Sequence, residues 1–367
     1  MFKIIALILA SISLFSFNSF AKDDGNYPNF SGSALFEMRA DTVTKTNKNG
    51  VDSNNVGGNI DTNFNVNLNK NWSVISNLKF RQINQQSSAN PERYRQILSS
   101  NRGFGMNDDG LIIEELKAQF ANEDAKFYFG KFNPSFGTAH RKEKRLGVFA
   151  TDFTKDYELR EKLGGGFAAL LENSEINVSA FFNDTTFLSD SAINSRGKAK
   201  RSDGTAGNTG VPNSYSVSIE GQHLFGVPDL FYNAGYRNQA VENMPGSDNE
   251  TGFVAGVEYL LPLDLKTSII PFLEIAKIDN LSGEKGRDSL FTTMALIAKY
   301  SGWTIGASHI VRDIEANSGN FKDKQTQYFV GYKFNNNIAV DLSHAQIKED
   351  GASGDLIGLL VSYIYDF

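Results

Sequence analysis

The chain of 367 residues contains no cysteine, which excludes disulfide bonds and thiolate metal sites as sources of stability. Beyond residue 21 it has no run of about 18 consecutive apolar residues, the length that a membrane-spanning helix needs. Proline is scarce, with 8 residues, and the formal net charge is only -6. An acidic chain with a single short basic run does not fit a nucleic-acid-binding protein, so we expect no nucleic-acid partner.

The first residues have the three-part layout of a secretory signal peptide. Lys3 precedes an apolar stretch over residues 4–17, and Ser19-Phe20-Ala21 forms a small-x-small cleavage pattern. The charged residues that follow end the apolar run too early for a membrane anchor. We therefore predict that residues 1–21 are a cleaved signal peptide and that residues 22–367 form one domain.

Aromatic residues and glycine are abundant, with 29 Phe, 13 Tyr and 33 Gly, and apolar residues recur with a period of two. In "NIDTNFNVNL" (59–68), Ile, Thr, Phe, Val and Leu alternate without exception with Asn or Asp. A helix would scatter these residues around its circumference, whereas a strand places them on two opposite faces. The period therefore predicts half-apolar strands.

The same pattern continues to the end of the chain and predicts an even number of strands, sixteen. They are residues 29–41, 58–68, 72–81, 111–121, 125–132, 164–172, 175–183, 214–223, 229–239, 251–261, 265–277, 288–300, 303–313, 324–334, 338–347 and 355–367. Segments of about ten alternating residues are typical of a transmembrane antiparallel β-barrel. The predicted fold class is accordingly all-β.

The predicted connections alternate strictly between short and long. The short ones are 69–71, 122–124, 173–174, 224–228, 262–264, 301–302 and 335–337, and the long ones are 42–57, 82–110, 133–163, 184–213, 240–250, 278–287, 314–323 and 348–354. Periplasmic turns and extracellular loops alternate in this way on a bacterial barrel with both ends in the periplasm.

The side chains predicted to face inward are largely charged. They include Glu37, Arg39, Asp61, Lys79, Arg81, Glu115, Lys117, Lys126, Glu220, Arg237, Glu258, Lys299, Lys333 and Asp341. Neither lipid nor a dry core would accept such a set, but a water-filled lumen would, and sixteen strands leave room for one. We therefore expect a polar inner wall of mixed sign.

The last residues, "LLVSYIYDF" (359–367), resemble the terminal signature of Gram-negative outer-membrane proteins. Tyr363, Tyr365 and Phe367 share one face and end the chain on an aromatic residue. The resemblance implies that they form an assembly signal read by the barrel-assembly machinery. Aromatic residues near the strand ends, such as Trp72 and Trp303, are expected to form the interfacial girdles.

In strand count, loop order and terminal signature, the chain resembles the sixteen-stranded porins. "GKFNPSFG" (130–137), "DFTKDYELREKLGGGF" (152–167) and "NVSAFFND" (177–184) also resemble phosphate-selective and siderophore-type porins. The resemblance implies that the third extracellular loop, residues 133–163, folds into the lumen and narrows it. It also implies a homotrimer.

The stretch "HRKEKR" in this loop supplies candidate residues for the pore constriction. The candidates are His140, Arg141, Lys142, Lys144 and Arg145, with Asp152 and Asp156 as possible acidic counterparts. The candidate pore wall is Arg39, Lys79, Arg81 and Lys117. Two assignments stay open: a mostly basic filter for anions, or a basic wall that faces an acidic loop. A third reading makes the basic run an ordinary solvated loop face.

No residues suggest catalysis or a cofactor. The four histidines lie in no nucleophile or base motif, and no metal-ligand spacing stands out. The sequence therefore predicts a non-enzymatic protein of the outer membrane, in contact with lipid and lipopolysaccharide, through which small hydrophilic solutes and ions diffuse passively. A porin specific for phosphate, another anion or a siderophore is one alternative, and a non-conducting adhesin that binds a partner through loops 82–110 and 184–213 is another.

Overall fold

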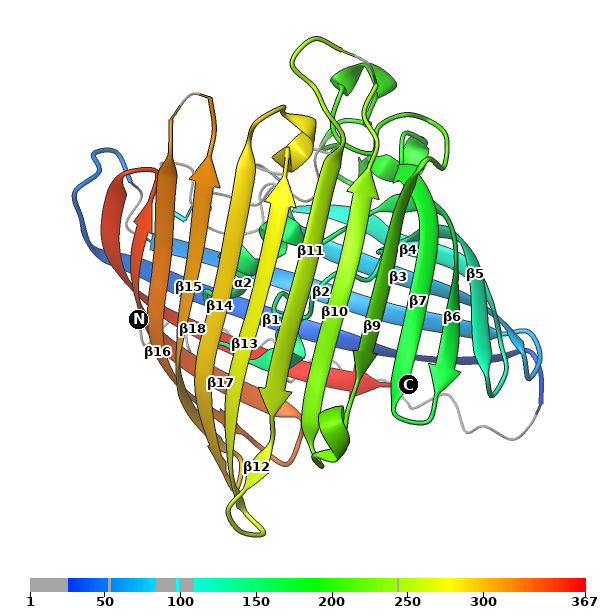
Figure 1. Cartoon of the computed structure of the whole chain (residues 1–367). Coiled ribbons are helices and arrows are strands. Elements are labelled where there is room, and N and C mark those ends of the chain that lie inside the picture. Colours follow the sequence, from blue (N-terminus) through cyan, green and yellow to red (C-terminus); the bar gives the residue numbers. More distant parts are fainter. Residues whose placement is uncertain (1–25, 52–53, 84–96, 99–108, 243, 318) are drawn as a thin grey trace.

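The computed structural model describes residues 26–51, 54–83, 97–98, 109–242, 244–317 and 319–367. The predicted signal peptide and most of loop 82–110 lie outside these ranges. Sixteen long strands pair antiparallel with their neighbours in one closed sheet, and β1 completes the closure by pairing with both β2 and β18 (Figure 1). No helix in the described ranges combines the length and the apolar character that a bilayer crossing would need.

The wall strands follow the predicted order. They are β1 (Asn29–Thr46), β2 (Asn54–Asn67), β3 (Trp72–Gln82), β4 (Asp109–Ala121), β5 (Ala125–Phe132), β6 (Lys162–Leu171), β7 (Ser174–Asn183), β9 (Ser214–Gly221), β10 (Leu230–Gln239), β11 (Glu250–Tyr259), β13 (Thr267–Asp279), β14 (Asp288–Tyr300), β15 (Trp303–Glu315), β16 (Phe321–Lys333), β17 (Ile338–Glu349) and β18 (Ala352–Asp366). Strands β1–β4 and β15–β18 are longer than predicted, whereas β9, β10 and β11 are shorter. Two short strands, β8 (Ser191–Ala192) and β12 (Leu261–Pro262), pair with β4 and β13. The predicted sixteen-stranded barrel is confirmed.

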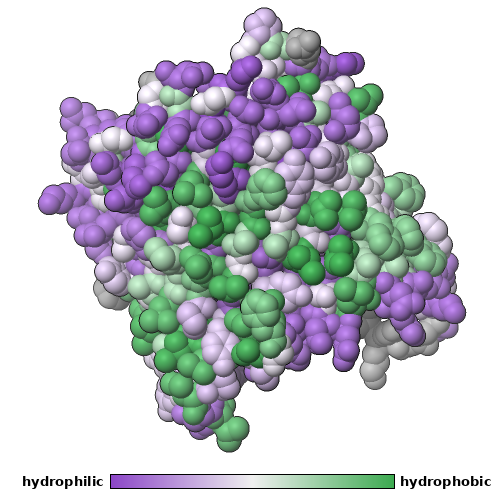
Figure 2. Space-filling view, in the orientation of Figure 1, coloured by the Kyte–Doolittle hydropathy of each residue, from purple (hydrophilic) through white to green (hydrophobic). Residues whose placement is uncertain are grey.

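The outer surface is apolar around its middle. In β13, Leu273 and Ile275 are exposed, whereas Phe272 and Glu274 are buried on the inner face. Figure 2 shows hydrophobic residues across the middle of the visible face and hydrophilic residues gathered at the end that carries the longer connections. Successive side chains of a strand point to opposite faces, so the exposed apolar residues of each strand gather on the outer surface.

Aromatic side chains run along the other end of the barrel from strand to strand. The ring of Trp72 lies 5.4 Å from that of Phe120, and the ring of Phe127 lies 4.8 Å from that of Phe167. Trp303 packs in the same way against a tyrosine of β16, at 4.8 Å. These rings occupy the strand ends where the sequence predicts an aromatic girdle.

The final residue takes part in closing the barrel. The backbone N–H of Phe367 donates to the Gly32 carbonyl, and the Gly32 N–H donates to the Phe367 carbonyl. Tyr363 stacks on Phe36 of β1 with 6.1 Å between ring centroids. The terminal aromatic residues therefore join the last strand to the first.

The predicted strict alternation of short and long connections is wrong. The connection between β17 and β18 is a two-residue turn, Asp350-Gly351, where the prediction has a long loop over 348–354. Strand pairing continues past the apolar band into polar residues, and both turn residues adopt the positive φ that a tight hairpin requires, +49° and +75°. Conversely, η5 (Leu224–Gly226) lengthens a turn that was predicted to be short.

A polar inner wall is confirmed for β1–β3, whereas the inner face of β13–β16 is mixed, with large apolar side chains beside polar ones such as Glu274, Ser308 and Gln327. The inner face of those later strands carries Ile270, Phe272, Phe291, Ile310 and Phe329, all at most 5 % exposed. Part of the inner face of these strands is apolar, like their outer face, because it packs against a folded segment of the chain rather than water. Counting charged residues could not reveal this second apolar face.

Gly130 offers a test of the β4–β5 contact. Its φ is +133°, and a Cβ at this position would lie 2.9 Å from the Cα of Lys117 on the neighbouring strand. We expect Gly130→Ala to lower the free energy of unfolding by about 2 kcal/mol, because alanine is strained here. Denaturant unfolding in lipid vesicles, followed by tryptophan fluorescence, measures the change.

Gly57→Ala is the matched control, because its Cβ would meet only the flexible Gln82 side chain, at 3.6 Å. An equal loss of stability in the two variants would contradict the strain argument.

Candidate pore constriction

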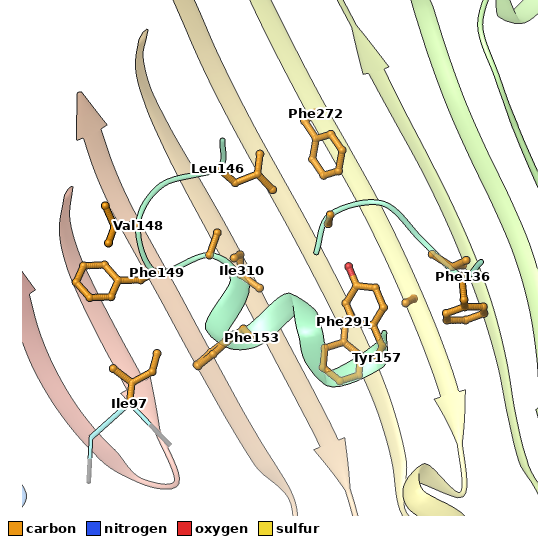
Figure 3. Packing of buried hydrophobic residues seen from close by; sticks show 14 of the residues in the cluster. Ile97, Phe136, Leu146, Val148, Phe149, Phe153, Tyr157, Phe272, Phe291 and Ile310 are labelled. Carbon is orange, nitrogen blue, oxygen red and sulfur yellow. The ribbon is translucent and has the colours of Figure 1, made fainter. Parts of the chain in front are cut away.

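The segment between β5 and β6, residues 133–161, carries three short helical turns: η1 (Lys142–Lys144), α2 (Thr151–Thr154) and η2 (Lys155–Tyr157). Its buried aromatic residues Phe136, Phe149, Phe153 and Tyr157 are at most 1 % exposed. Phe153 and Tyr157 pack against the apolar inner residues of β13–β16, among them Phe291 and Ile310 (Figure 3), whereas Phe136 lies against β10 and β11 and Phe149 against β18. Aromatic burial therefore attaches one side of the segment to the wall.

Wall arginines cover three of these phenylalanine rings. The guanidinium carbon of Arg237 lies 4.6 Å from the Phe136 ring centroid, that of Arg39 lies 4.7 Å from Phe149, and that of Arg312 lies 4.8 Å from Phe153. Each arginine makes a cation–π contact with a ring, and its charge is balanced by an ion pair with a nearby carboxylate. The segment is thereby held by β1, β10 and β15.

Side chains of the wall also satisfy the backbone of the segment. Glu274 of β13 accepts hydrogen bonds from the N–H groups of Thr138 (2.7 Å) and Ala139 (3.0 Å) and from the Tyr157 hydroxyl (2.7 Å). The Ser308 hydroxyl of β15 donates to the Leu146 carbonyl at 2.7 Å. The backbone N–H and C=O groups of an irregular segment away from water need such partners, because no neighbouring strand forms hydrogen bonds with them.

The predicted basic residues Arg141, Lys142, Lys144 and Arg145 form a compact group, here called the basic turn (residues 141–145). Their side chains reach carboxylates on five strands. Arg141 pairs with Glu220, Lys142 with Glu37 (2.5 Å) and Asp61 (2.6 Å), Lys144 with Glu258 (2.6 Å), and Arg145 with Asp341. The basic turn is thus tied to β1 and β2, to β9 and β11, and to β17.

The two predicted acidic counterparts also pair with the wall. Asp152 accepts two hydrogen bonds from Arg39, at 3.1 and 2.9 Å, and Arg39 also contacts Asp41 at 3.0 Å. Asp156 pairs with Arg312 of β15. At Asp152 and Asp156, wall arginines therefore face acidic residues of the loop. At the basic turn the arrangement is the opposite, because wall carboxylates face basic residues of the loop.

The remaining predicted wall residues pair with acidic neighbours on β4. Lys79 and Arg81 both approach Glu114, and Lys117 contacts Glu115 at 3.1 Å. Sequence alternation predicts Glu115 on the inner face and therefore leaves Glu114 outside. A register shift opposite Asn77 and Leu78 brings both glutamates inside. Two successive glutamates in an apolar strand were the signal for this bulge.

His140 lies beside Tyr157, largely buried, and contacts Glu158 of the same segment rather than a wall strand. Its Nε2 lies 3.7 Å from a Glu158 carboxylate oxygen, and its ring lies edge-on to that of Tyr157. Burial lowers the pKa of His140 below its ordinary value of 6.5, and the Glu158 carboxylate opposes that shift only in part. His140 therefore adds no positive charge to the basic turn at neutral pH.

A cavity of about 650 Å³ runs between the basic turn and strands β1–β3. Its lining extends from Ser33 and Ile364, near the ends of β1 and β18 that carry the termini, to Asp41 and Asn55 toward the opposite end. A second cavity of about 370 Å³ lies toward β9–β13, and Arg141 lines both. The basic turn therefore borders a cavity with charged and polar lining residues along one side of the barrel, while aromatic residues fill the other side.

A double-mutant cycle on Arg145 and Asp341 tests whether the basic turn is held by its ion pairs. These side chains are 24 % and 16 % exposed, so we expect a coupling energy of about 1–3 kcal/mol between Arg145→Gln and Asp341→Asn in denaturant unfolding. The pair Arg201–Glu242 is a control at the surface, at 67 % and 32 % exposed. Its coupling should be below about 1 kcal/mol. Equal coupling in the two pairs would contradict the assignment.

The lowered pKa of His140 has a consequence for stability. Below about pH 6.5 the unfolded chain binds a proton at this imidazole, whereas the folded chain resists it. Stability should therefore decrease as the pH falls from about 7 to about 5, and His140→Gln should reduce that decrease. Denaturant midpoints at the two pH values measure the slope. An unchanged slope in the variant would show that His140 titrates normally.

The sequence matches no protein-family model and no curated protein. The fold is nevertheless similar to that of several solved outer-membrane proteins. OprB of Pseudomonas putida has a TM-score of 0.62 at 9 % identity, over 92 % of this chain and 94 % of that chain. OmpF of Salmonella typhi has a TM-score of 0.59 at 11 % identity, over 94 % and 99 %. OmpT of Vibrio cholerae has a TM-score of 0.52 at 12 % identity, over 95 % and 100 %. At these identities the likeness concerns the fold, and the chain has the closed sixteen-stranded barrel of the outer-membrane porins.

Proposed function

We propose that the protein is an outer-membrane porin that allows small hydrophilic solutes and ions to diffuse passively. The observation that carries this proposal is the cavity of about 650 Å³ between the basic turn and β1–β3, whose lining extends along β1 from Ser33 to Asp41. Its walls carry Glu37, Arg39 and Asp61 together with asparagine and serine side chains. A polar passage inside an apolar outer surface suits a channel across a lipid bilayer.

In this proposal the segment 133–161 is the third extracellular loop, folded inward to narrow the passage. Its contacts with inner side chains of β1, β2, β9, β11 and β17 support that role. Arg141, Lys142 and Arg145 then border the constriction together with Asp152. Lys144 borders the second cavity, and Asp156 and His140 serve to hold the loop in place.

Export, assembly and association complete the proposal. Residues 1–21 are proposed to be removed as a signal peptide, and Tyr363, Tyr365 and Phe367 to be recognised by the barrel-assembly machinery. The apolar outer surface suits contact with outer-membrane lipid and, at the loop end, lipopolysaccharide. A homotrimer is proposed because OmpT of Vibrio cholerae, which shares the fold with a TM-score of 0.51, has been solved in a trimer form.

Obstructing the passage tests the function. We expect Asn59→Trp to lower the single-channel conductance at least about twofold, because Asn59 lines the cavity and the indole would fill part of its width. Recordings from the purified protein in a planar bilayer measure the change. The matched control is Ile60→Trp, at the next residue of β2, which alternation places on the outer face.

The control should conduct like the unmodified protein. A protein that inserts but never conducts would contradict the porin proposal and favour the adhesin. Equal currents in Asn59→Trp and the unmodified protein would show that ions take another route.

A further inference from the structure

The wall of the barrel has a gap beside β4, where the segment 133–161 turns inward. β4 pairs with β3 from Phe120 to Asp109, but β5 pairs with β4 only as far as Leu116. Residues 109–115 of β4 therefore pair with no residue of β5. Lipid cannot satisfy an open sheet edge of this kind, because it offers the backbone N–H and C=O groups no hydrogen-bond partners.

The loop between β7 and β9, residues 184–213, fills this gap from within the same chain. Its short strand β8 pairs antiparallel with residues 111–112 of β4. The side chain of Asn194, just after β8, donates a hydrogen bond to the Asp109 carbonyl at 2.8 Å. The loop therefore continues the sheet at the place where β5 has ended.

Four buried charged side chains join this loop to the point where the segment 133–161 rejoins the wall. Lys131 of β5 contacts Glu161 at 2.9 Å and Asp184 at 3.0 Å. Arg196 of the loop donates to both carboxylate oxygens of Glu161, at 2.9 and 2.5 Å. All four side chains are at most 2 % exposed. Removing one member of such a group is costly, because the charge left behind stays desolvated.

Glu161 lies at the neck of the segment 133–161. Its backbone N–H donates to the Asn133 side-chain oxygen at 2.8 Å and so joins the last residue of the segment to the first. Its φ of +57° is in the left-handed region, which a residue with a side chain adopts only when its surroundings hold it there. Arg196 provides such a hold, because its guanidinium also donates to the Ser189 carbonyl, at 3.0 and 2.7 Å. The neck is thereby fixed to the loop that fills the wall.

We propose that Arg196 is a positioning residue of the channel. It couples the loop that fills the wall to the neck of the segment 133–161, and it thereby holds steady the width of the passage that this segment borders. This inference rests on the proposed channel function. Because the gap beside β4 is filled by the protein's own loop, one chain is complete at this position without a second copy.

The test is the steadiness of the single-channel current of the purified protein in a planar bilayer. Arg196→Gln leaves the carboxylates of Glu161 and Asp184 with Lys131 alone, so brief current fluctuations should become at least about tenfold more frequent. Removing the matching anion as well restores the charge balance of the group. The double variant Arg196→Gln/Glu161→Gln should therefore fluctuate within about twofold of the unmodified channel.

Arg201→Gln is the matched control, because Arg201 lies in the same loop but its side chain is 67 % exposed and pairs with Glu242 at the surface. Its current should be as steady as that of the unmodified channel. A second readout does not need conduction. A cysteine in place of Ala199, which is 2 % exposed in this loop, should react with a water-soluble maleimide at least about tenfold faster once Arg196→Gln is added.

Equal fluctuation frequencies and equal labelling rates with and without Arg196→Gln would overturn this inference and leave the channel function intact. Absence of current in the unmodified protein and in every variant would overturn the proposed function. The role of Arg196 in setting the passage would fall with it, whereas faster labelling would still show that Arg196 holds the loop.

Discussion

Ion pairing between the inner wall and the segment 133–161 is the interaction on which the interior arrangement depends. Glu37, Asp61, Glu220, Glu258 and Asp341 come from five strands of one closed sheet, and each binds a cation of the basic turn. Because these strands lie on different sides of the barrel, the ties fix the turn in three dimensions. Removing one partner would leave a largely desolvated charge, which costs more than the pair itself contributes.

The barrel interior divides into a packed part and a hydrated part. Against β13–β16 the segment places Phe153 and Tyr157 on apolar wall residues, and this contact resembles the core of a soluble domain. Against β1–β3 it presents charged and polar groups to a cavity of about 650 Å³. A single segment can do both because its aromatic residues and its basic turn occupy successive parts of the chain. The cavity is therefore bordered by a segment that is packed against the wall on its other side.

The sequence predicted the barrel but not its interior packing. Alternation in stretches such as 59–68, the even strand count and the terminal aromatic residues were enough to predict sixteen strands in the observed order. They also placed Glu37, Asp61, Glu258 and Asp341 correctly on the inner face. A period of two reports which face a residue occupies, but it does not report what lies opposite that face.

Two errors follow from that limit. The apolar part of the inner face of β13–β16 was missed because alternation of two apolar residues, as in Phe272 and Leu273, gives no contrast between the faces. Glu114 was missed because a bulge changes the phase of alternation within β4. The pairing of the basic turn with wall carboxylates was likewise inaccessible, since it depends on contacts between residues as much as 196 positions apart.

The central claim is that solutes pass between the basic turn and β1–β3, and substituted cysteines test it most directly because the chain has no cysteine of its own. Asn59→Cys places a thiol on the cavity, whereas Ser289→Cys places one on the inner face of β14 at a position only 2 % exposed. A charged thiol reagent added to conducting channels should change the current through Asn59→Cys and leave Ser289→Cys unaffected. Modification of Ser289→Cys with no effect at Asn59→Cys would place the conducting path on the other side of the barrel and contradict the account.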